Sequence, residues 1–264
     1  MDATKGETRF LNVQIEIEPP FTKSKLELKF PRWVPGSYFI REPMQYLTDI
    51  SCIQGETNLE FVRKDVDAVS IKHVNNKQNI IVNYKILGIE LSVRSTHIDH
   101  SHLHMMPPFT FLLPTSGIDE ARMNLPHKIS LHAPIGWSPA TQLTTISSKE
   151  NCLSINQIKG DTFNLQASNR DELLDGIIEI NARDNISFSV DGRTHILKLW
   201  DSGGYQTDEQ MVTKFVDDMT KVVKEYHALF GKPDWGDYVV ILQLTESSRG
   251  CLLYTSPSPR DSGK

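Results

Sequence analysis

The chain has 264 residues, of which 39% are hydrophobic, enough to bury a sizeable core in one large domain or two modest ones. Charged residues make up 23% and the net charge is −5, with no basic block, which argues against nucleic acid as a partner. The longest apolar runs fall far short of the about 20 residues that cross a bilayer, so no membrane span is predicted. The first residues lack the basic start and apolar stretch of a secretory signal, and we expect a cytoplasmic protein unless a signal lies upstream. Cys52, Cys152 and Cys251 are too far apart for a zinc ribbon or a redox motif.

Short alternating segments broken by Gly, Pro, Asn and Ser run from Arg9 to about Asn181. This pattern predicts antiparallel strands with one buried and one solvated face. The clearest segments are 11–17, 26–30, 80–86 and 129–133. Many short strands at regular spacing predict a β-sandwich rather than a parallel α/β sheet.

The pattern changes after about Asp184, where a strand over 195–200 precedes a long amphipathic helix and a second strand over 238–244. Thr207 is the expected N-cap of the helix, because Gln210 three residues on completes a capping box. Apolar residues from Met211 to Phe230 recur at helical spacing and are predicted to be core. Strand, helix and strand therefore open a second domain of mixed α/β type.

This second domain is short for an independent core, with about 65 residues before Gly250. We expect its helix to present an apolar stripe that lacks most of its sheet, which predicts association of the chain.

The last residues resemble translated sequencing adaptor rather than protein. Eleven residues from Cys251 to Asp261 fit such an adaptor, and residues 251–264 are expected to be an artefactual, disordered tail. A short Pro/Ser-rich disordered tail is the alternative. On the adaptor interpretation native sequence ends near Gly250.

One segment, residues 30–42, resembles the signature Trp-x-Pro-Gly-Ser-Tyr-x-Ile-Arg of the N-terminal domain of the glycyl aminopeptidase family. The matching residues are Trp33, Pro35, Gly36, Ser37, Tyr38 and Arg41. Pro35 and Gly36 suit a type II turn, and the flanking aromatics are expected to pack it against a sheet. A structural role is favoured over a catalytic one, and Ser37 lacks the Gly-x-Ser-x-Gly elbow of a nucleophile.

Three later segments resemble the same family in the required order. Residues 92–99 are similar to a family strand, and residues 171–179 are similar to the acidic segment at the domain junction, through Asp171, Leu173 and Asp175. Residues 230–250 resemble the run into a Gly-Gly-Leu-Glu-His segment, of which only the first Gly is present.

The resemblance implies a parent that is a zinc-dependent aminopeptidase removing Gly or Ala from peptides, with a thermolysin-like catalytic domain followed by a PDZ domain. Its zinc would be held by a His-Glu-x-x-His helix and a downstream Glu. That motif does not occur in this sequence, so the chain is predicted to carry no catalytic residue, to bind no metal and to be inactive. The expected divisions are a β-sandwich over 1–183 and the start of the catalytic domain over 184–250. Val239, Ile241 and Gln243 are expected to lie on a strand beside the substrate cleft.

The densest group of metal-ligand residue types is His97, Asp99, His100, His102 and His104. Alternation predicts the last three imidazoles on one strand face, about 7 Å apart, which fits a tetrahedral shell poorly without residues from elsewhere. A polar loop or strand edge is therefore favoured over a metal site.

The acidic group of Asp171, Glu172 and Asp175 has two interpretations. It is either an acid/base pair or a set of turn and cap residues, and the second is favoured because Asn169 and Gly176 flank it. A stand-alone β-sandwich module that binds a ligand or a metal remains the alternative function for the whole chain.

Overall fold

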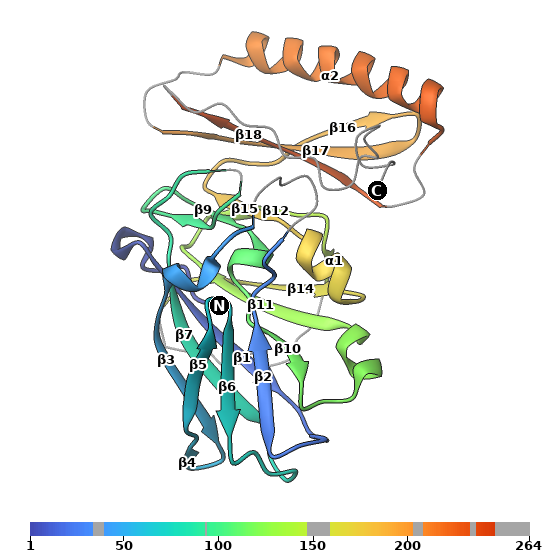
Figure 1. Ribbon diagram of the computed structural model, residues 1–264. Helices are drawn as coiled ribbons and strands as arrows, with labels where there is room; N and C mark the ends of the chain where they lie inside the picture. The colour runs from blue at the N-terminus through green and yellow to red at the C-terminus, as the bar shows by residue number, and fades with distance from the viewer. Residues whose placement is uncertain (34–39, 93, 147–158, 203–207, 233–235, 246–264) are drawn as a thin grey trace.

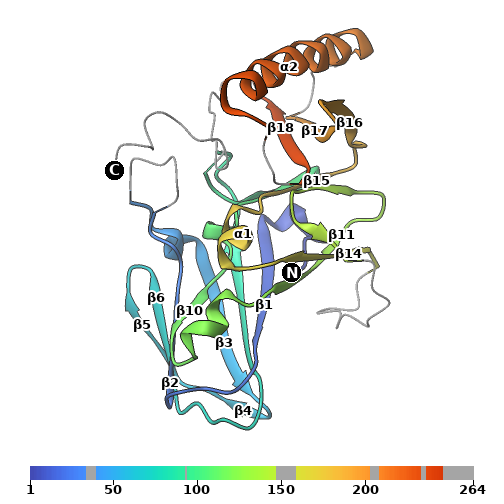
Figure 2. The same cartoon turned by 90° about the vertical axis from the view of Figure 1, so that its right-hand side faces the viewer.

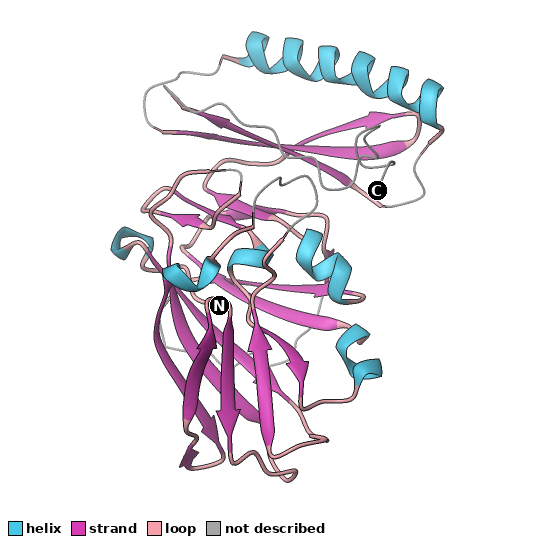
Figure 3. Cartoon of the chain, in the orientation of Figure 1, coloured by secondary structure: helices cyan, strands magenta, loops and turns pink. Residues whose placement is uncertain are grey.

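The protein is described by a computed structural model over residues 1–33, 40–92, 94–146, 159–202, 208–232 and 236–245 (Figure 1). Strands dominate and pair mostly antiparallel, which confirms the predicted mainly β fold (Figure 3). Two antiparallel sheets form a sandwich, and a smaller unit that contains the long helix lies beyond one end of the sandwich.

The first layer of the sandwich is a four-stranded sheet in the order β1, β7, β3, β4. Its strands are β1 (Phe10–Ile17), β7 (Ile80–Leu87), β3 (Leu47–Gln54) and β4 (Thr57–Asn58). The second layer has the order β10, β2, β6, β5. Its strands are β10 (Leu113–Ser116), β2 (Lys25–Lys29), β6 (Ala68–Lys72) and β5 (Phe61–Asp65).

The buried side chains of both layers form one hydrophobic core. Every second residue of β1 and β7 points into it, because successive side chains of a strand point to opposite faces. Leu11, Val13, Leu26 and Leu28 are all at most 2% exposed, as their alternation predicts.

Two smaller sheets close the end of the sandwich. One has the order β11, β14, β13, with β11 (His127–Ala133), β14 (Asp161–Ala167) and β13 (Thr144–Thr145). The other, called here the junction sheet, has the order β12, β15, β9, β8, with β12 (Ser138–Ala140), β15 (Ile178–Asn181), β9 (His102–Met105) and β8 (His97–Ile98). The short helices in this part are η1 (Gly6–Thr8), η2 (Pro43–Tyr46), η3 (Pro107–Phe109), η4 (Glu120–Asn124) and α1 (Arg170–Asp175).

The last unit, called here the C-terminal sheet, consists of β16 (Ile186–Val190), β17 (Arg193–Asp201) and β18 (Tyr238–Leu244), crossed by α2 (Glu209–Phe230). β17 and β18 are parallel, and α2 is the connection between them, which confirms the predicted strand, helix and strand. Figure 2 shows α2 and these strands stacked beyond the junction sheet.

The N-cap of α2 is Asp208, whose carboxylate accepts a hydrogen bond from the backbone N–H of Met211 at 2.6 Å. The prediction of Thr207 as the cap is therefore wrong, and Thr207 itself lies outside the described residues. Asp serves as well as Thr here, because either side chain can accept from the free N–H groups of the first turn.

The apolar stripe of α2 is not core in this chain, in contrast to its assignment from periodicity. No residue of α2 is buried, and Met211, Tyr226 and Leu229 are 61%, 47% and 75% exposed. The stripe stays exposed because the C-terminal sheet is small, and α2 packs mainly on its strand β16. The expected exposed stripe is thus present. Within the described residues, no helix combines the length and apolar character that a bilayer crossing needs.

Candidate functional site

A buried cluster of imidazoles and carboxylates lies where the junction sheet meets the C-terminal sheet. His97 comes from β8, His102 and His104 come from β9, and Glu179 comes from the neighbouring β15, directly opposite His104 in the register. These four side chains are at most 4% exposed. We call them, together with Asp99, the histidine cluster.

Glu179 is the centre of the histidine cluster. Its carboxylate accepts hydrogen bonds from Nδ1 of His102 and from Nδ1 of His104, each at 3.0 Å, and from Nε2 of Gln243 at 3.1 Å. Burial alone would raise the pKa of this carboxyl, but the hydrogen bonds from His102 and His104 outweigh it and hold the pKa at about 2. The carboxylate is therefore charged at neutral pH and satisfied by three donors from two strands, β9 and β18.

The hydrogen bonds of the cluster run in one direction. Arginine has only donors, so Arg9 donates to Nε2 of His97 across 3.0 Å, which assigns the ring proton of His97 to Nδ1. That Nδ1 lies 2.7 Å from Nε2 of His102, to which it donates, and His102 in turn donates from Nδ1 to Glu179. Burial, with His102 as the next cause, lowers the pKa of His97 to about 4, consistent with a neutral ring.

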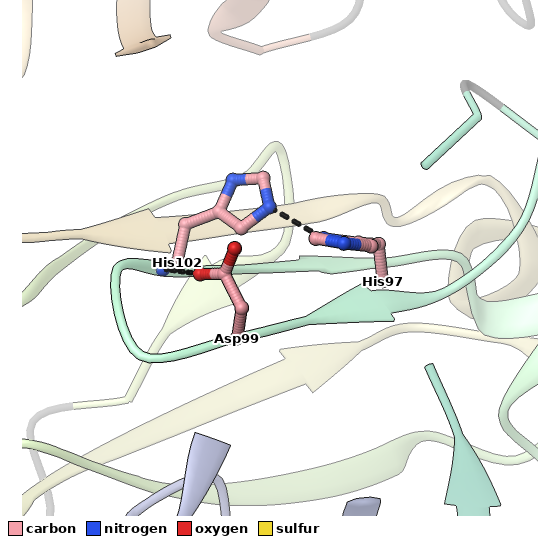
Figure 4. Close-up of side chains that lie close together, drawn as sticks. All are labelled: His97, Asp99 and His102. Atoms are coloured by element: carbon pink, nitrogen blue, oxygen red, sulfur yellow. Dashed lines mark hydrogen bonds between the residues drawn. The ribbon is translucent and has the colours of Figure 1, made fainter. Parts of the chain in front are cut away.

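Asp99 shapes the tight turn between β8 and β9. Its Oδ1 accepts from the backbone N–H and the hydroxyl of Ser101, both at 2.7 Å, and from the backbone N–H of His102 at 3.0 Å. Its Oδ2 lies 3.7 Å from a guanidinium nitrogen of Arg9. Burial would raise the pKa of Asp99, and the hydrogen bonds from Ser101 lower it below its ordinary value. Figure 4 shows the Asp99 carboxylate below the ring of His102 and to the left of the ring of His97.

Side chains of the C-terminal sheet cover the histidine cluster. The indole of Trp200, on β17, stacks on the ring of His102 with 3.6 Å between centroids and an angle of 23°. Its Nε1 donates to the hydroxyl of Ser101 at 3.0 Å. Gln243, on β18, reaches Glu179. Two of the three strands of the C-terminal sheet, β17 and β18, therefore make polar contacts to the junction sheet and its turn.

A buried lysine lies in the same junction. Lys198 of β17 is fully buried, and its Nζ donates to Oγ of Ser138 at 2.9 Å and to the carbonyl oxygen of Arg183. Burial lowers the pKa of Lys198 to about 8, although the charge of Glu179 opposes this. The junction thus holds both a charged carboxylate and an amine whose pKa is lowered toward neutral pH.

The histidines predicted to share one strand face are only partly found there. His102 and His104 lie on β9 and both reach Glu179, but His100 is exposed in the preceding turn. The favoured interpretation as a polar loop or strand edge is correct only in that His97 lies on the outer strand β8, because the imidazoles of His97, His102 and His104 are all buried. The turn at Asp99 ends β8 before His100, which alternation alone did not reveal.

The signature segment is described only in part. Pro35, Gly36, Ser37 and Tyr38 lie outside the described residues, so the predicted type II turn stays a prediction. Trp33 is 58% exposed, and the expected packing of this aromatic against a sheet is wrong. The backbone N–H of Arg41 donates to the carbonyl of Arg32 at 2.8 Å, which brings the two ends of the segment together.

The acidic group at the junction forms α1. Asn169 caps this helix by accepting from the N–H of Glu172 at 2.8 Å, and Oε2 of Glu172 accepts from the N–H of Ser168 at 2.7 Å, so Glu172 has the predicted cap role. Leu173 is 3% exposed and holds the helix on the core. Burial, and next the charge of Asp171, raises the pKa of Asp175. α1 carries none of the residues of the histidine cluster.

Glu179, Trp200 and Arg9 were not predicted as site residues. A charged residue inside the apolar run of β15 was the available signal for Glu179, and Gln243 interrupts β18 in the same way. Nothing local distinguishes Arg9, which meets His97 only through the pairing of distant strands.

A β-sandwich followed by an α/β unit is an arrangement found in solved aminopeptidase structures. An aminopeptidase N family protein from Idiomarina loihiensis is similar with a TM-score of 0.78 and 23% sequence identity, over 94% of this chain and 39% of that chain. An M1 zinc metallopeptidase from Deinococcus radiodurans has a TM-score of 0.49 and 10% identity, over 94% of this chain and 55% of that chain. The chain thus shares its fold with part of the first protein and spans 39% of the length of that protein.

The sequence identifies the family more narrowly. The Peptidase M61 N-terminal domain matches residues 1–181, and the chain belongs to that family. Curated protein sequences give no match. Membership confirms the peptidase part of the resemblance that began with residues 30–42.

The zinc site that the family resemblance implies for the parent needs a His-Glu-x-x-His helix. The sequence contains no His-Glu-x-x-His, and His100 and His104, although four apart, lie in a turn and on a strand. The residues present therefore do not fit a zincin site, and no catalytic step is derived from such a metal.

Proposed function

We propose that this chain is the N-terminal portion of a zinc-dependent aminopeptidase that releases small N-terminal residues, Gly or Ala, from peptides. Membership of the Peptidase M61 N-terminal domain family carries this proposal. The structural similarity supports it, because it covers 94% of the chain and so reaches well beyond residue 181 into the C-terminal sheet. The preference for Gly or Ala rests on the resemblance of residues 30–42 to the glycyl aminopeptidase family.

In this proposal residues 1–183 are the β-sandwich domain and residues 184–250 are the start of a thermolysin-like catalytic domain, with a PDZ domain later in the parent. The chain contributes the scaffold, while zinc and the activated water belong to the parent's remaining part. The buried polar contacts of Trp200 and Gln243 with the histidine cluster support a fixed orientation of the two units.

The role proposed for β18 is to border the substrate cleft through Val239, Ile241 and Gln243. β18 is an outer strand of the C-terminal sheet, so one of its edges is not paired within the described residues. An extended peptide can add to such an edge by backbone hydrogen bonds. A structure of the full-length parent with a dipeptide analogue tests this role, and a peptide bound far from β18 would refute it.

The enzyme proposal is tested by reading the source gene past the codon for Gly250 in an independent clone and assaying the encoded full-length protein. We expect a His-Glu-x-x-His motif and turnover of Gly- and Ala-p-nitroanilide that a chelator abolishes, with none from the 264-residue chain. A genuine stop codon after Gly250 favours the stand-alone binding module instead. Turnover by the short chain, or a full-length protein inactive on all aminoacyl anilides, contradicts the proposal. The same reading tests whether residues 251–264 derive from adaptor.

A further inference from the structure

We propose that His97, Asp99 and His102 form a binding site for one divalent transition-metal ion, of which Zn²⁺ is the best match, and that the ion binds in exchange for the Arg9 guanidinium. One ligand atom of each of the three residues lies within 4.8 Å of the others, and all three residues are buried. Two imidazoles and a carboxylate are a donor set that suits Zn²⁺ and Co²⁺. The site is separate from the zinc of the proposed parent enzyme and does not depend on it.

Residues around the three ligands hold them in place. Glu179 accepts from Nδ1 of His102 and so leaves its Nε2 as the lone-pair nitrogen that faces His97. A carboxylate behind a metal-bound imidazole is the usual orienting contact at zinc sites. The indole of Trp200 covers the same ring. Asp99 is fixed through Oδ1 by the turn, which leaves Oδ2 for a cation.

The two ring nitrogens lie closer together than two ligands of one zinc ion. Nδ1 of His97 and Nε2 of His102 are 2.7 Å apart and share a proton, whereas tetrahedral bonds of about 2.0–2.1 Å to zinc place two nitrogens about 3.4 Å apart. The two rings must therefore separate by about 0.7 Å. That shift is small for His97, which lies on the short outer strand of the junction sheet.

The tautomer of His97 makes metal binding and the Arg9 contact mutually exclusive. When Nδ1 of His97 binds a metal, the proton of the neutral ring moves to Nε2, which then faces the donors of Arg9. Two donors cannot pair, so Arg9 must leave, and no proton is gained or lost overall. Its side chain is 43% exposed and its nitrogen lies 3.7 Å from Asp99, so release into solvent is sterically open.

This inference revises the expectation that the chain binds no metal. That expectation considered imidazoles on one strand, about 7 Å apart. The turn at Asp99 instead folds β8 against β9, and it is this pairing that brings His97 to His102.

The test is titration of the 264-residue chain with Co²⁺, followed by its visible absorption, with Zn²⁺ as competitor and metal content measured after dialysis. We expect saturation at one ion per chain. His102→Gln weakens binding at least about 10-fold, since even loss of an outer contact costs that much. Asp99→Asn has the same effect and retains the Oδ1 acceptor of the turn, which provides a second variant if His102→Gln does not fold. His100→Gln, an exposed imidazole in the same turn, is the matched control and leaves affinity unchanged.

Arg9→Gln separates this site from ordinary surface binding, because removal of the competing cation is expected to tighten Co²⁺ binding. Unchanged or weaker binding in Arg9→Gln overturns the exchange. Binding that survives both Asp99→Asn and His102→Gln, or that falls equally in His100→Gln, means an adventitious ion only and overturns the site.

Discussion

Truncation of Trp200 is the sharpest probe of how the two units are joined. Its indole is 5% exposed, stacks on His102 and donates to Ser101, so it makes both apolar and polar contacts across the junction. Trp200→Ala removes all of them and leaves a cavity, which costs about 3–5 kcal/mol of unfolding free energy. Trp200→Phe retains an aromatic ring over His102 but loses the N–H donor, worth about 0.5–1.5 kcal/mol.

The free energies are measured by urea unfolding followed by far-ultraviolet circular dichroism. The difference between the two variants, about 1.5–4.5 kcal/mol, corresponds to about 3–18 °C in Tm for a chain of this size, since 1 kcal/mol shifts Tm by about 2–4 °C. Hydrogen exchange gives the location, and we expect Trp200→Ala to raise exchange in β16 to β18 more than in β1 and β7. Ile135→Ala, at a site 71% exposed, is the control and changes stability by less than about 0.5 kcal/mol.

The reasoning is refuted if Trp200→Ala lies within about 1 kcal/mol of the wild type, or if Trp200→Phe is as costly as Trp200→Ala. The first result would mean that the junction is not held by this side chain. The second would mean that the hydrogen bond to Ser101, rather than stacking and burial, supplies the stability.

Three further predictions concern the packing and charges of the chain. Gly136→Ala is expected to lower the free energy of unfolding by about 1 kcal/mol, and Gly117→Ala by more than twice as much. Both glycines have positive φ, at 83° and 96°, but of the two only Gly117 would place a Cβ against a backbone oxygen, at 2.4 Å. Equal losses of Tm in the two variants would contradict this prediction. Leu173→Ala is expected to lower the free energy of unfolding by about 2–5 kcal/mol, because this side chain is 3% exposed, and a change below 1 kcal/mol would show that α1 is not anchored by it. Burial lowers the pKa of Lys198 from 10.5 to about 8, so between pH 8 and pH 10.5 the unfolded state binds more protons than the folded state. The wild type should therefore gain stability relative to Lys198→Met as the pH rises from 8 to 10.5. A difference in unfolding free energy that stays constant in urea titrations over this range would refute the lowered pKa of Lys198.

Periodicity was sufficient for most of the fold. The alternation at 11–17 and 80–86 is the burial pattern of β1 and β7, because one face of each strand meets a common core. The strand, helix and strand after Asp184 were likewise predictable. The cap of α2 was missed by one residue, since Thr207 and Asp208 are both good acceptors and only the backbone decides between them.

The sequence shows that histidines are concentrated in one segment, but it does not show which of them come together in space. Residues 97–104 are rich in imidazole, yet the turn at Asp99 determines which of them meet. Glu179 lies 75 residues from His104 in sequence and approaches it only through the pairing of β15 with β9. Long-range strand pairing of this kind leaves no local pattern, so the buried charge is recognised only once the register is known.

The position of β15 in the junction sheet has a consequence for the order in which the chain folds during synthesis. β15 is the last strand of the sheet in sequence, yet it lies between β12 and β9 rather than at an edge. The sheet therefore cannot close until the ribosome has released Asn181, the residue at which the family match also ends. Until then β12 has no partner in this sheet and β9 pairs only with β8, a state in which strand edges invite intermolecular pairing. The same insertion brings Glu179 to His102 and His104, so these hydrogen bonds of the cluster and the completed junction sheet form in one late step.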